Sequence, residues 1–316
     1  MTASDISFDL FKLFKSLKSF EVPSAPHKLS IFYEEKTPSD YVLCALNTIK
    51  RIIKKEGKLS KAILVFLPSK SDIYRLKIHL EEDRPTSVLV ILPLHSSLSK
   101  HEQSLVFKDY DKIKIILSTN IAETSITIPD IKYVIDTGLV KNKYVSPQGI
   151  IKYSIEYISK SSALQRAGRA GRTTKGTCYR LYSGETYNSF LDQDIPRIQY
   201  EPLDSLVLDL IALGIPDVYK FPFITKPPNL NIEIALSSLK RLGIIKNDNS
   251  SNYILTDAGK VISKLPIHPK HSHLLCIPNT THLLPRLILV VSCLSVNFEL
   301  KKSKDTEKYL NQRKVI

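Results

Sequence analysis

The segment from Gln165 to Arg172 combines phosphate-binding side chains with small residues that leave space beside them; it reads Gln-Arg-Ala-Gly-Arg-Ala-Gly-Arg. If this segment is helical, Gln165, Arg169 and Arg172 occupy positions i, i+4 and i+7 and share one face. Two guanidinium forks and a carboxamide then converge, as a polyphosphate site requires. A solvated basic helix face is the alternative, but glycines that each cost about 1 kcal/mol in a helix interior disfavour it.

A polar loop upstream has residue types suited to phosphate or sugar contacts. Ser118–Pro129 follows the apolar run Ile113–Leu117, which predicts a strand that enters a loop. Ligands of α/β sheets bind at such strand ends. Taken alone, the stretch is equally consistent with an ordinary Ser/Thr-rich turn.

These two segments, in this order, point to a known family. The chain resembles the C-terminal half of a DEAH-box RNA helicase: Ser118–Pro129 is similar to the family's motif V and Gln165–Arg172 to its motif VI. Further similarities are Ile63–Pro68 (motif IV), Pro93–Leu98, Tyr133–Asp136, Ile158–Lys160, Gly176–Tyr182, Phe221–Phe223 and Leu265–Pro269. The resemblance therefore covers nearly the whole chain, and chance does not supply so many matches in one order.

Composition agrees with this family without identifying it. The 316 residues allow about two domains. With 45 Lys and Arg against 31 Asp and Glu, the net charge of +14 favours a polyanionic partner, either nucleic acid or an anionic membrane surface. The longest apolar stretch, Leu287–Val296, is shorter than the roughly 20 residues of a membrane span, and no signal peptide is recognisable. Four scattered cysteines without a C-x-x-C pair argue against zinc and favour a reducing compartment.

Hydrophobic periodicity predicts alternating helices and strands. Asp40–Lys54 has helical spacing, and strands are predicted at Ile63–Leu67, Ser87–Leu92, Lys112–Leu117 and Tyr133–Asp136. This alternation implies a mainly parallel sheet covered by helices. Tyr144–Ile158 predicts a β-hairpin around Pro147-Gln148-Gly149. From Pro202 onward the pattern becomes helical, and Leu239–Thr256 suits the wing of a winged helix.

The resemblance implies an α/β fold: a RecA-like parallel-sheet domain with helices on both faces, then a winged-helix domain and the start of a ratchet-like helical bundle. The expected parts are residues 1–24 (end of motif III of a first RecA-like domain, and linker), 25–185 (second RecA-like domain), 186–258 (winged helix) and 259–316 (truncated helical bundle).

The sequence contains neither the G-x-x-x-x-G-K-[ST] phosphate loop nor the Asp-Glu-Ala-His segment of a first RecA-like domain. Met1–Ser4 resembles the end of motif III, so we expect the numbering to begin at an internal methionine of a longer helicase. A misassigned start codon, a split gene and true degeneration all remain open.

The resemblance also implies roles for single residues in the nucleotide site. Arg169 and Arg172 are expected to be arginine fingers that reach the γ-phosphate of ATP, with Gln165 placing that phosphate or its attacking water. Phe107 is expected against the adenine face, although an ordinary core phenylalanine is the alternative. Thr127 is expected near the ribose. ATP and Mg²⁺ are the implied cofactors; the Mg²⁺ ligands belong to the missing domain, and no metal site is expected in this chain.

RNA contacts are implied for Thr119 and Asn120, at phosphates, and for Lys141–Gly149, as a wedge or strand guide. Pro129 stands where many members of the family have Asp, which puts a carboxylate contact to the nucleotide in doubt. Ser69 replaces a glycine after motif IV, a change expected to alter only the turn.

Two functions follow: an ATP-dependent RNA helicase, or a catalytically inactive RNA-binding or protein-docking remnant of one. Retention of Gln165, Arg169 and Arg172 favours the helicase, although this chain alone is expected to be inactive.

Within the family, the chain resembles the nucleolar members that act on pre-ribosomal RNA. This resemblance rests on Lys28–Phe32, Pro129 and Leu284–Arg286, and sequence drift at permissive positions is the alternative. We therefore expect pre-rRNA processing in the nucleus and nucleolus, with pre-ribosomal particles as partners. A protein activator that docks on the winged-helix and helical-bundle region is a further expected partner; a membrane is not.

Overall fold

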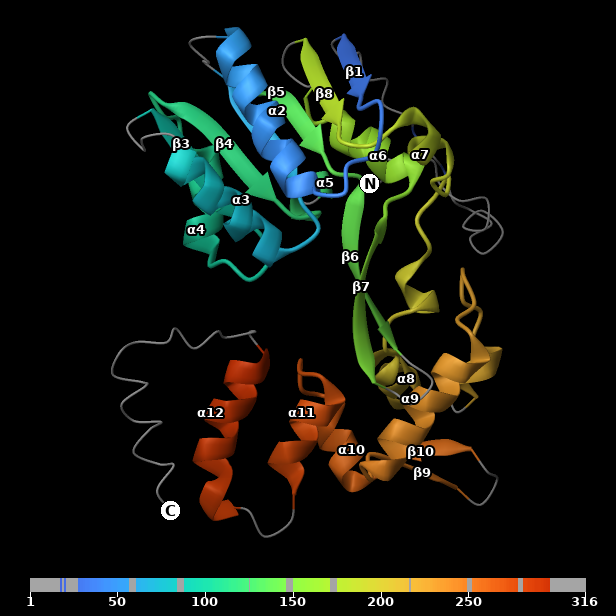
Figure 1. The fold of residues 1–316 in the computed structure, drawn as a ribbon. Helices are drawn as coiled ribbons and strands as arrows, with labels where there is room; N and C mark the ends of the chain where they lie inside the picture. The colour runs from blue at the N-terminus through green and yellow to red at the C-terminus, as the bar shows by residue number, and fades with distance from the viewer. Residues whose placement is uncertain are drawn as a thin grey trace. The chain divides into compact units, whose positions relative to one another are not determined.

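The computed structural model describes residues 18, 20, 28–56, 61–83, 88–124, 126–145, 150–170, 175–215, 217–248, 252–277 and 281–295. The chain divides into two compact units (Figure 1). The first contains the described residues up to Glu201 together with Phe223–Lys226, and the second contains Pro202–Pro222 and the described residues from Pro227 onward. Met1–Ser4, with its resemblance to motif III, lies outside the described residues.

A six-stranded parallel sheet forms the centre of the first unit, in the order β1-β8-β5-β2-β4-β3. The strands are β1 (Leu29–Tyr33), β2 (Ala62–Phe66), β3 (Leu89–Leu94), β4 (Ile113–Ser118), β5 (Ile131–Asp136) and β8 (Gly176–Arg180). The four strands predicted from apolar runs are confirmed as β2 to β5. Periodicity does not predict β1 and β8, because Ser30, Thr177 and Arg180 interrupt their apolar pattern.

Helices cover both faces of this sheet, as expected. In β2, Ile63 and Val65 belong to one core cluster, with α2 (Tyr41–Glu56) and α3 (Lys70–Asp83), whereas Leu64 and Phe66 belong to the other. The second cluster receives Val106 of η1 (Leu105–Phe107), Ala122 of α5 (Ile121–Thr124) and Ala167 of α6 (Lys160–Ala167). A strand buried on both faces needs a continuous apolar run, which is why β2 is recognisable from sequence.

A two-stranded antiparallel ribbon leaves the sheet after β5. It consists of β6 (Leu139–Val145) and β7 (Ile151–Tyr157) and projects away from the sheet in Figure 1. The hairpin predicted at Tyr144–Ile158 is confirmed and begins earlier than expected, at Leu139. Gly138 makes the turn into β6 with φ +71°, and an added Cβ would lie 2.6 Å from the Tyr182 ring. The tip, residues 146–149, lies outside the described residues.

The second unit is mainly helical, as predicted after Pro202. Its principal elements are α8 (Asp204–Ala212), α9 (Asn229–Arg241), the antiparallel pair β9 (Ile245–Asn247) and β10 (Tyr253–Leu255), α10 (Asp257–Ile262), α11 (Pro269–His273) and α12 (Leu284–Ser295). Among the helices of the described segments, none is both long and apolar enough to cross a membrane. The domain boundaries expected after residues 185 and 258 stay predictions.

Candidate functional site

The helix that carries Gln165 ends before Arg169. α6 starts after its N-cap, Ser159, and ends at Ala167, with Gly168 as the C-cap residue. The prediction that Gln165, Arg169 and Arg172 share one helix face is therefore wrong for Arg169, which lies in the turn after the helix. Glycine is a poor helix-interior residue and a frequent helix terminator, which explains the early end. Arg172 lies outside the described residues.

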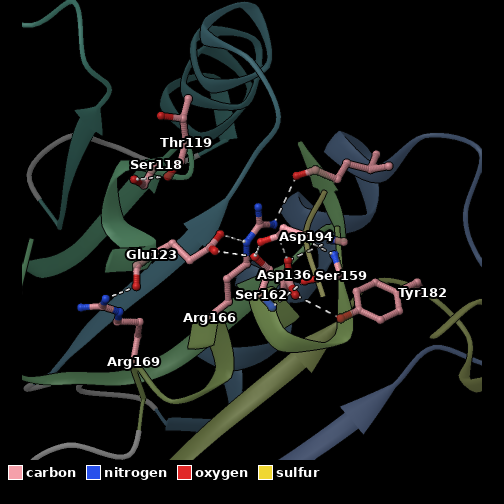
Figure 2. Close-up of polar contacts among 12 residues, drawn as sticks. Ser118, Thr119, Glu123, Asp136, Ser159, Ser162, Arg166, Arg169, Tyr182 and Asp194 are labelled. Carbon is pink, nitrogen blue, oxygen red and sulfur yellow. Dashed lines mark hydrogen bonds and ion pairs between the residues drawn. The ribbon is translucent and has the colours of Figure 1, made fainter. Parts of the chain in front are cut away.

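Arg169 is bonded to the loop that follows α5. Its side chain is buried, its Nη1 donates to the Ile126 carbonyl (2.9 Å), and its Nη2 donates to the Glu123 carbonyl (Figure 2). The sequence-based picture of unpaired cations over a cleft is thus wrong for this residue. Motif V and the turn in motif VI instead form one hydrogen-bonded unit.

Arg166 is the charged centre of the site, and sequence analysis missed it. The side chain is 1 % exposed; its Nε donates to Glu123 Oε2 and its Nη1 to Asp136 Oδ1, both at 2.9 Å. Nη1 also donates to the Leu139 carbonyl (3.2 Å), and the guanidinium lies over the Phe66 ring. Burial alone would lower the pKa of Arg166, but the charges of Asp136 and Glu123 outweigh it and raise that pKa. Arg166 therefore stays charged and joins α6 to α5 and to the end of β5.

The Asp136 carboxylate is fully buried and receives three donors. Besides Arg166, the Tyr182 hydroxyl donates to Oδ2 (3.0 Å) and the Gly138 N–H to Oδ1 (2.9 Å). Burial, and then the charge of Asp136, raise the pKa of Tyr182, so its hydroxyl remains a donor. A buried carboxylate is costly unless it is paired in this way. The sequence signals for this cluster were an acidic residue at the end of a predicted strand and the family similarities at Tyr133–Asp136 and Gly176–Tyr182, which do not show that these residues meet.

The residues expected at the adenine and ribose lie on two different segments. Phe107 ends η1 and is 46 % exposed, so the alternative of an ordinary core phenylalanine does not fit. Thr127 is exposed in the loop after α5, directly after Ile126, whose carbonyl binds Arg169. Gln165 is half-buried on α6. Their nucleotide roles stay predictions.

Thr119 and Asn120 lie where β4 passes into α5. The Thr119 N–H donates to the Leu94 carbonyl (3.1 Å), and the Thr119 carbonyl accepts from the Ser118 hydroxyl (2.8 Å). Asn120 is exposed and lines a cleft of about 680 Å³. Its walls are formed by the start of α5, most of β6 with the end of β7, Ser162 and Arg166 of α6, and the segment after α7 (Gly184–Asn188).

The cleft walls carry cations and aromatic rings. The cationic residues are Lys141, Lys143, Arg197 and the buried Arg166, and the rings of Tyr144 and Tyr200 lie 5.0 Å apart. Basic grooves with aromatic side chains are typical of proteins that bind single-stranded nucleic acid. Carboxylates are present too: Glu156 accepts a hydrogen bond from the Tyr144 hydroxyl, and this bond is the main reason that the pKa of Glu156 is lowered.

Comparison with known proteins identifies the family. The helicase conserved C-terminal domain matches residues 44–174. This range includes Ser118–Pro129 and Gln165–Arg172, the two segments that resemble motifs V and VI. Over 306 residues the chain is 35 % identical to the mouse (Mus musculus) ATP-dependent RNA helicase DHX33, covering 93 % of this chain and 43 % of that protein. The chain belongs to the DEAH-box RNA helicase family.

A further relative and a solved structure show the same similarity. The pre-mRNA-splicing factor ATP-dependent RNA helicase prp22 of Schizosaccharomyces pombe is 34 % identical over 288 residues, covering 88 % of this chain and 24 % of that protein. The crystal structure of the Escherichia coli DEAH/RHA helicase HrpB matches with a TM-score of 0.83 over 96 % of this chain and 38 % of that one, at 23 % identity. This likeness shows the fold, and the sheet is the RecA-like sheet of the helicase C-terminal domain. The chain spans less than half the length of these DEAH-box relatives.

Proposed function

We propose that this chain supplies the second half of an ATP-dependent RNA helicase that couples ATP hydrolysis to remodelling of RNA or RNA–protein complexes. One observation carries the proposal: Arg169, the proposed finger, is bonded to the segment that begins with Thr119 and Asn120, the proposed RNA contacts. Side chains proposed for the two ligands therefore belong to segments that are hydrogen-bonded to each other. A movement at one ligand would be transmitted to the other through these bonds.

The proposed nucleotide contacts fit ATP chemically. Phe107 offers an accessible ring for the adenine, Thr127 an exposed hydroxyl for the ribose, and Gln165 a half-buried carboxamide for the γ-phosphate or its attacking water. Arg169 must exchange a carbonyl for a phosphate oxygen; the phosphate is anionic and can accept two parallel N–H bonds from the guanidinium fork, which favours the exchange. Arg172 is proposed as the second finger. The fingers neutralise charge that develops on the phosphoryl group.

Mg²⁺ would neutralise phosphate charge in the same reaction. Within the described ranges, no three His, Cys, Asp or Glu side chains are grouped as metal ligands. On the family resemblance, we assign the Mg²⁺ ligands to a first RecA-like domain, the part of a helicase that carries the phosphate loop and the Asp-Glu-Ala-His segment.

Finer assignments extend this proposal. Residues 186–258, with the ribbon of β9 and β10, are proposed as a winged helix, and residues 259–316, which include α12, as the start of a ratchet-like bundle. A protein activator would dock on these parts. Nucleolar action on pre-ribosomal particles rests on the residue similarities at Lys28–Phe32, Pro129 and Leu284–Arg286, whereas one relative is named as a splicing factor.

The test is to compare ATP turnover by the isolated chain and by a fusion to the first RecA-like domain of a DEAH-box relative. The isolated chain should show no measurable ATPase activity and very weak ATP affinity, because half of the nucleotide site is absent. The fusion should hydrolyse ATP, and its rate of ATP turnover should rise when RNA is added. An inactive remnant would leave a correctly folded fusion without RNA-stimulated turnover, and turnover by the isolated chain would mean that the site is misassigned.

A further inference from the structure

The N-terminus of α6 is held by the segment that follows α7. The Lys160 N–H donates to the Leu191 carbonyl (2.8 Å), and the Ser161 N–H donates to the Asp192 carbonyl (3.1 Å). The Asp194 side chain accepts from the Ser159 N–H (Oδ1, 3.3 Å). The first N–H groups of a helix have no partner within the helix, so these bonds satisfy groups that would otherwise be unpaired. A carboxylate at this end also interacts favourably with the helix dipole.

Ser162 joins this anchor to the centre of the site. Its hydroxyl is 2.8 Å from Asp194 Oδ2 and 2.5 Å from Glu123 Oε1 (Figure 2). Having one proton, the hydroxyl donates to one carboxylate at a time. Glu123 in turn binds Arg166 through its other carboxylate oxygen and Arg169 through its backbone carbonyl. Contacts thus run from Asp194 through Ser162 and Glu123 to Arg169, with the Ser162 hydroxyl bonded to one or the other carboxylate.

The same segment continues directly into the second unit. From Asp194 the chain runs through η2 (Arg197–Gln199) to Glu201, and the second unit begins at Pro202. A displacement of Asp194 changes the acceptors at the start of α6 and leaves the Ser162 hydroxyl with Glu123 alone. Since a misplacement of about 1 Å at a catalytic group can cost about 10²-fold in rate, even a small resulting shift of Arg169 would lower turnover.

We propose that Asp194 is a positioning residue that couples the chain entering the second unit to Arg169, so that this connection regulates ATP turnover. The inference rests on the proposed function. Asp194 touches no reacting group in this scheme; it acts through Ser162 and Glu123.

Amide hydrogen exchange of the 316-residue chain tests the anchor without any activity. Asp194→Ala should raise exchange at the amides of residues 159–162 at least about fivefold, the loss expected for one helix cap. Asp192→Ala is the matched control, since its exposed carboxylate binds only the Lys160 ammonium among the contacts of the described residues (2.9 Å). Equal exchange in the two variants would overturn the anchor.

Kinetics of the fusion enzyme test the coupling. Asp194→Ala and Ser162→Ala should each lower RNA-stimulated kcat by about 10- to 100-fold at unchanged KM for ATP. The double variant should be no worse than the more severe single variant, because both break one connection. Asp194→Asn, which keeps a carbonyl acceptor, should recover most of the turnover, and Asp192→Ala should leave it unchanged.

Additive losses, or a rise in KM alone, would mean that Asp194 only supports the fold and would overturn the coupling. If the unsubstituted fusion hydrolyses no ATP, the proposed function fails and the coupling fails with it. The exchange measurement still decides separately whether Asp194 anchors α6.

Discussion

Two arginines three positions apart in motif VI have different surroundings. Arg166 neutralises Glu123 and Asp136 inside the unit, whereas Arg169 holds backbone carbonyls at the edge of the proposed nucleotide site. We accordingly expect Arg166 to contribute to stability, whereas the proposed finger role requires Arg169 to change partners during the reaction.

Replacing Arg166 should destabilise the fold strongly. Arg166→Met leaves two carboxylates without their buried partner, and breaking a buried pair from one side costs about 3–5 kcal/mol. The free energy of unfolding in urea measures this loss. Arg51→Met is the control: the Arg51–Glu34 pair is 3.3 Å apart with Arg51 61 % exposed, so its loss should cost at most about 1 kcal/mol. Similar losses in both variants would contradict the central role of Arg166.

The proposed fingers should matter for turnover rather than for RNA affinity. In the fusion enzyme, Arg169→Ala and Arg172→Ala should each lower kcat for ATP at least about 10²-fold. Arg169→Lys and Arg172→Lys should also lower kcat, because the point charge of a lysine ammonium does not reproduce the planar fork of the guanidinium at the phosphate oxygens. RNA affinity without nucleotide should change little. Intact turnover with abolished RNA binding would instead make motif VI part of a basic RNA-binding face.

At the scale of elements, the sequence predicted best what depends on local pattern. β2 to β5 were recognisable because each contains an apolar run, unbroken and fully buried in β2, as suits strands of a sheet covered on both faces. The end of α6 was missed because a spacing argument assumes that the helix continues, whereas Gly168 caps it. The Arg166–Asp136 pair was missed because it joins residues 30 positions apart, a proximity that one sequence does not reveal.

The start of β8 depends on a glycine. A Cβ at Gly176 would lie 2.2 Å from the Ala170 carbonyl oxygen, so Gly176→Ala must displace the backbone at Gly176 or at Ala170, inside motif VI. We expect a loss of about 1–3 kcal/mol in unfolding free energy, as for overpacking. At Gly184 an added Cβ meets nothing within 4 Å, so Gly184→Ala should stay within about 0.5 kcal/mol of the parent. Thermal or urea unfolding compares the two, and equal stabilities would refute the close contact at Gly176.

At the scale of the whole molecule, composition indicated a polyanionic binding partner but not which polyanion. A net charge of +14 is compatible with any polyanionic partner. RNA is inferred as the partner only from the ordered motifs and from the named relatives. The cleft beside Asn120 could not be predicted, because segments distant in sequence form it: the ribbon, α5, α6 and the residues after α7.

RNA binding by this chain should be weak, nearly independent of sequence and strongly dependent on salt. Phosphate contacts release counterions, so log affinity should fall against log salt with a slope of about 0.7 per phosphate neutralised. Fluorescence anisotropy with single-stranded RNA at a series of salt concentrations measures this slope. Removing the two lysines of the cleft wall, in Lys141→Ala with Lys143→Ala, should reduce the slope by about 1.4 if each meets one phosphate. Lys50→Ala is the control, because Lys50 pairs with Asp83 at 2.5 Å where α2 meets α3. Salt-insensitive binding would rule out recognition of the RNA backbone, and an unchanged slope in the double variant would place the RNA elsewhere than in this cleft.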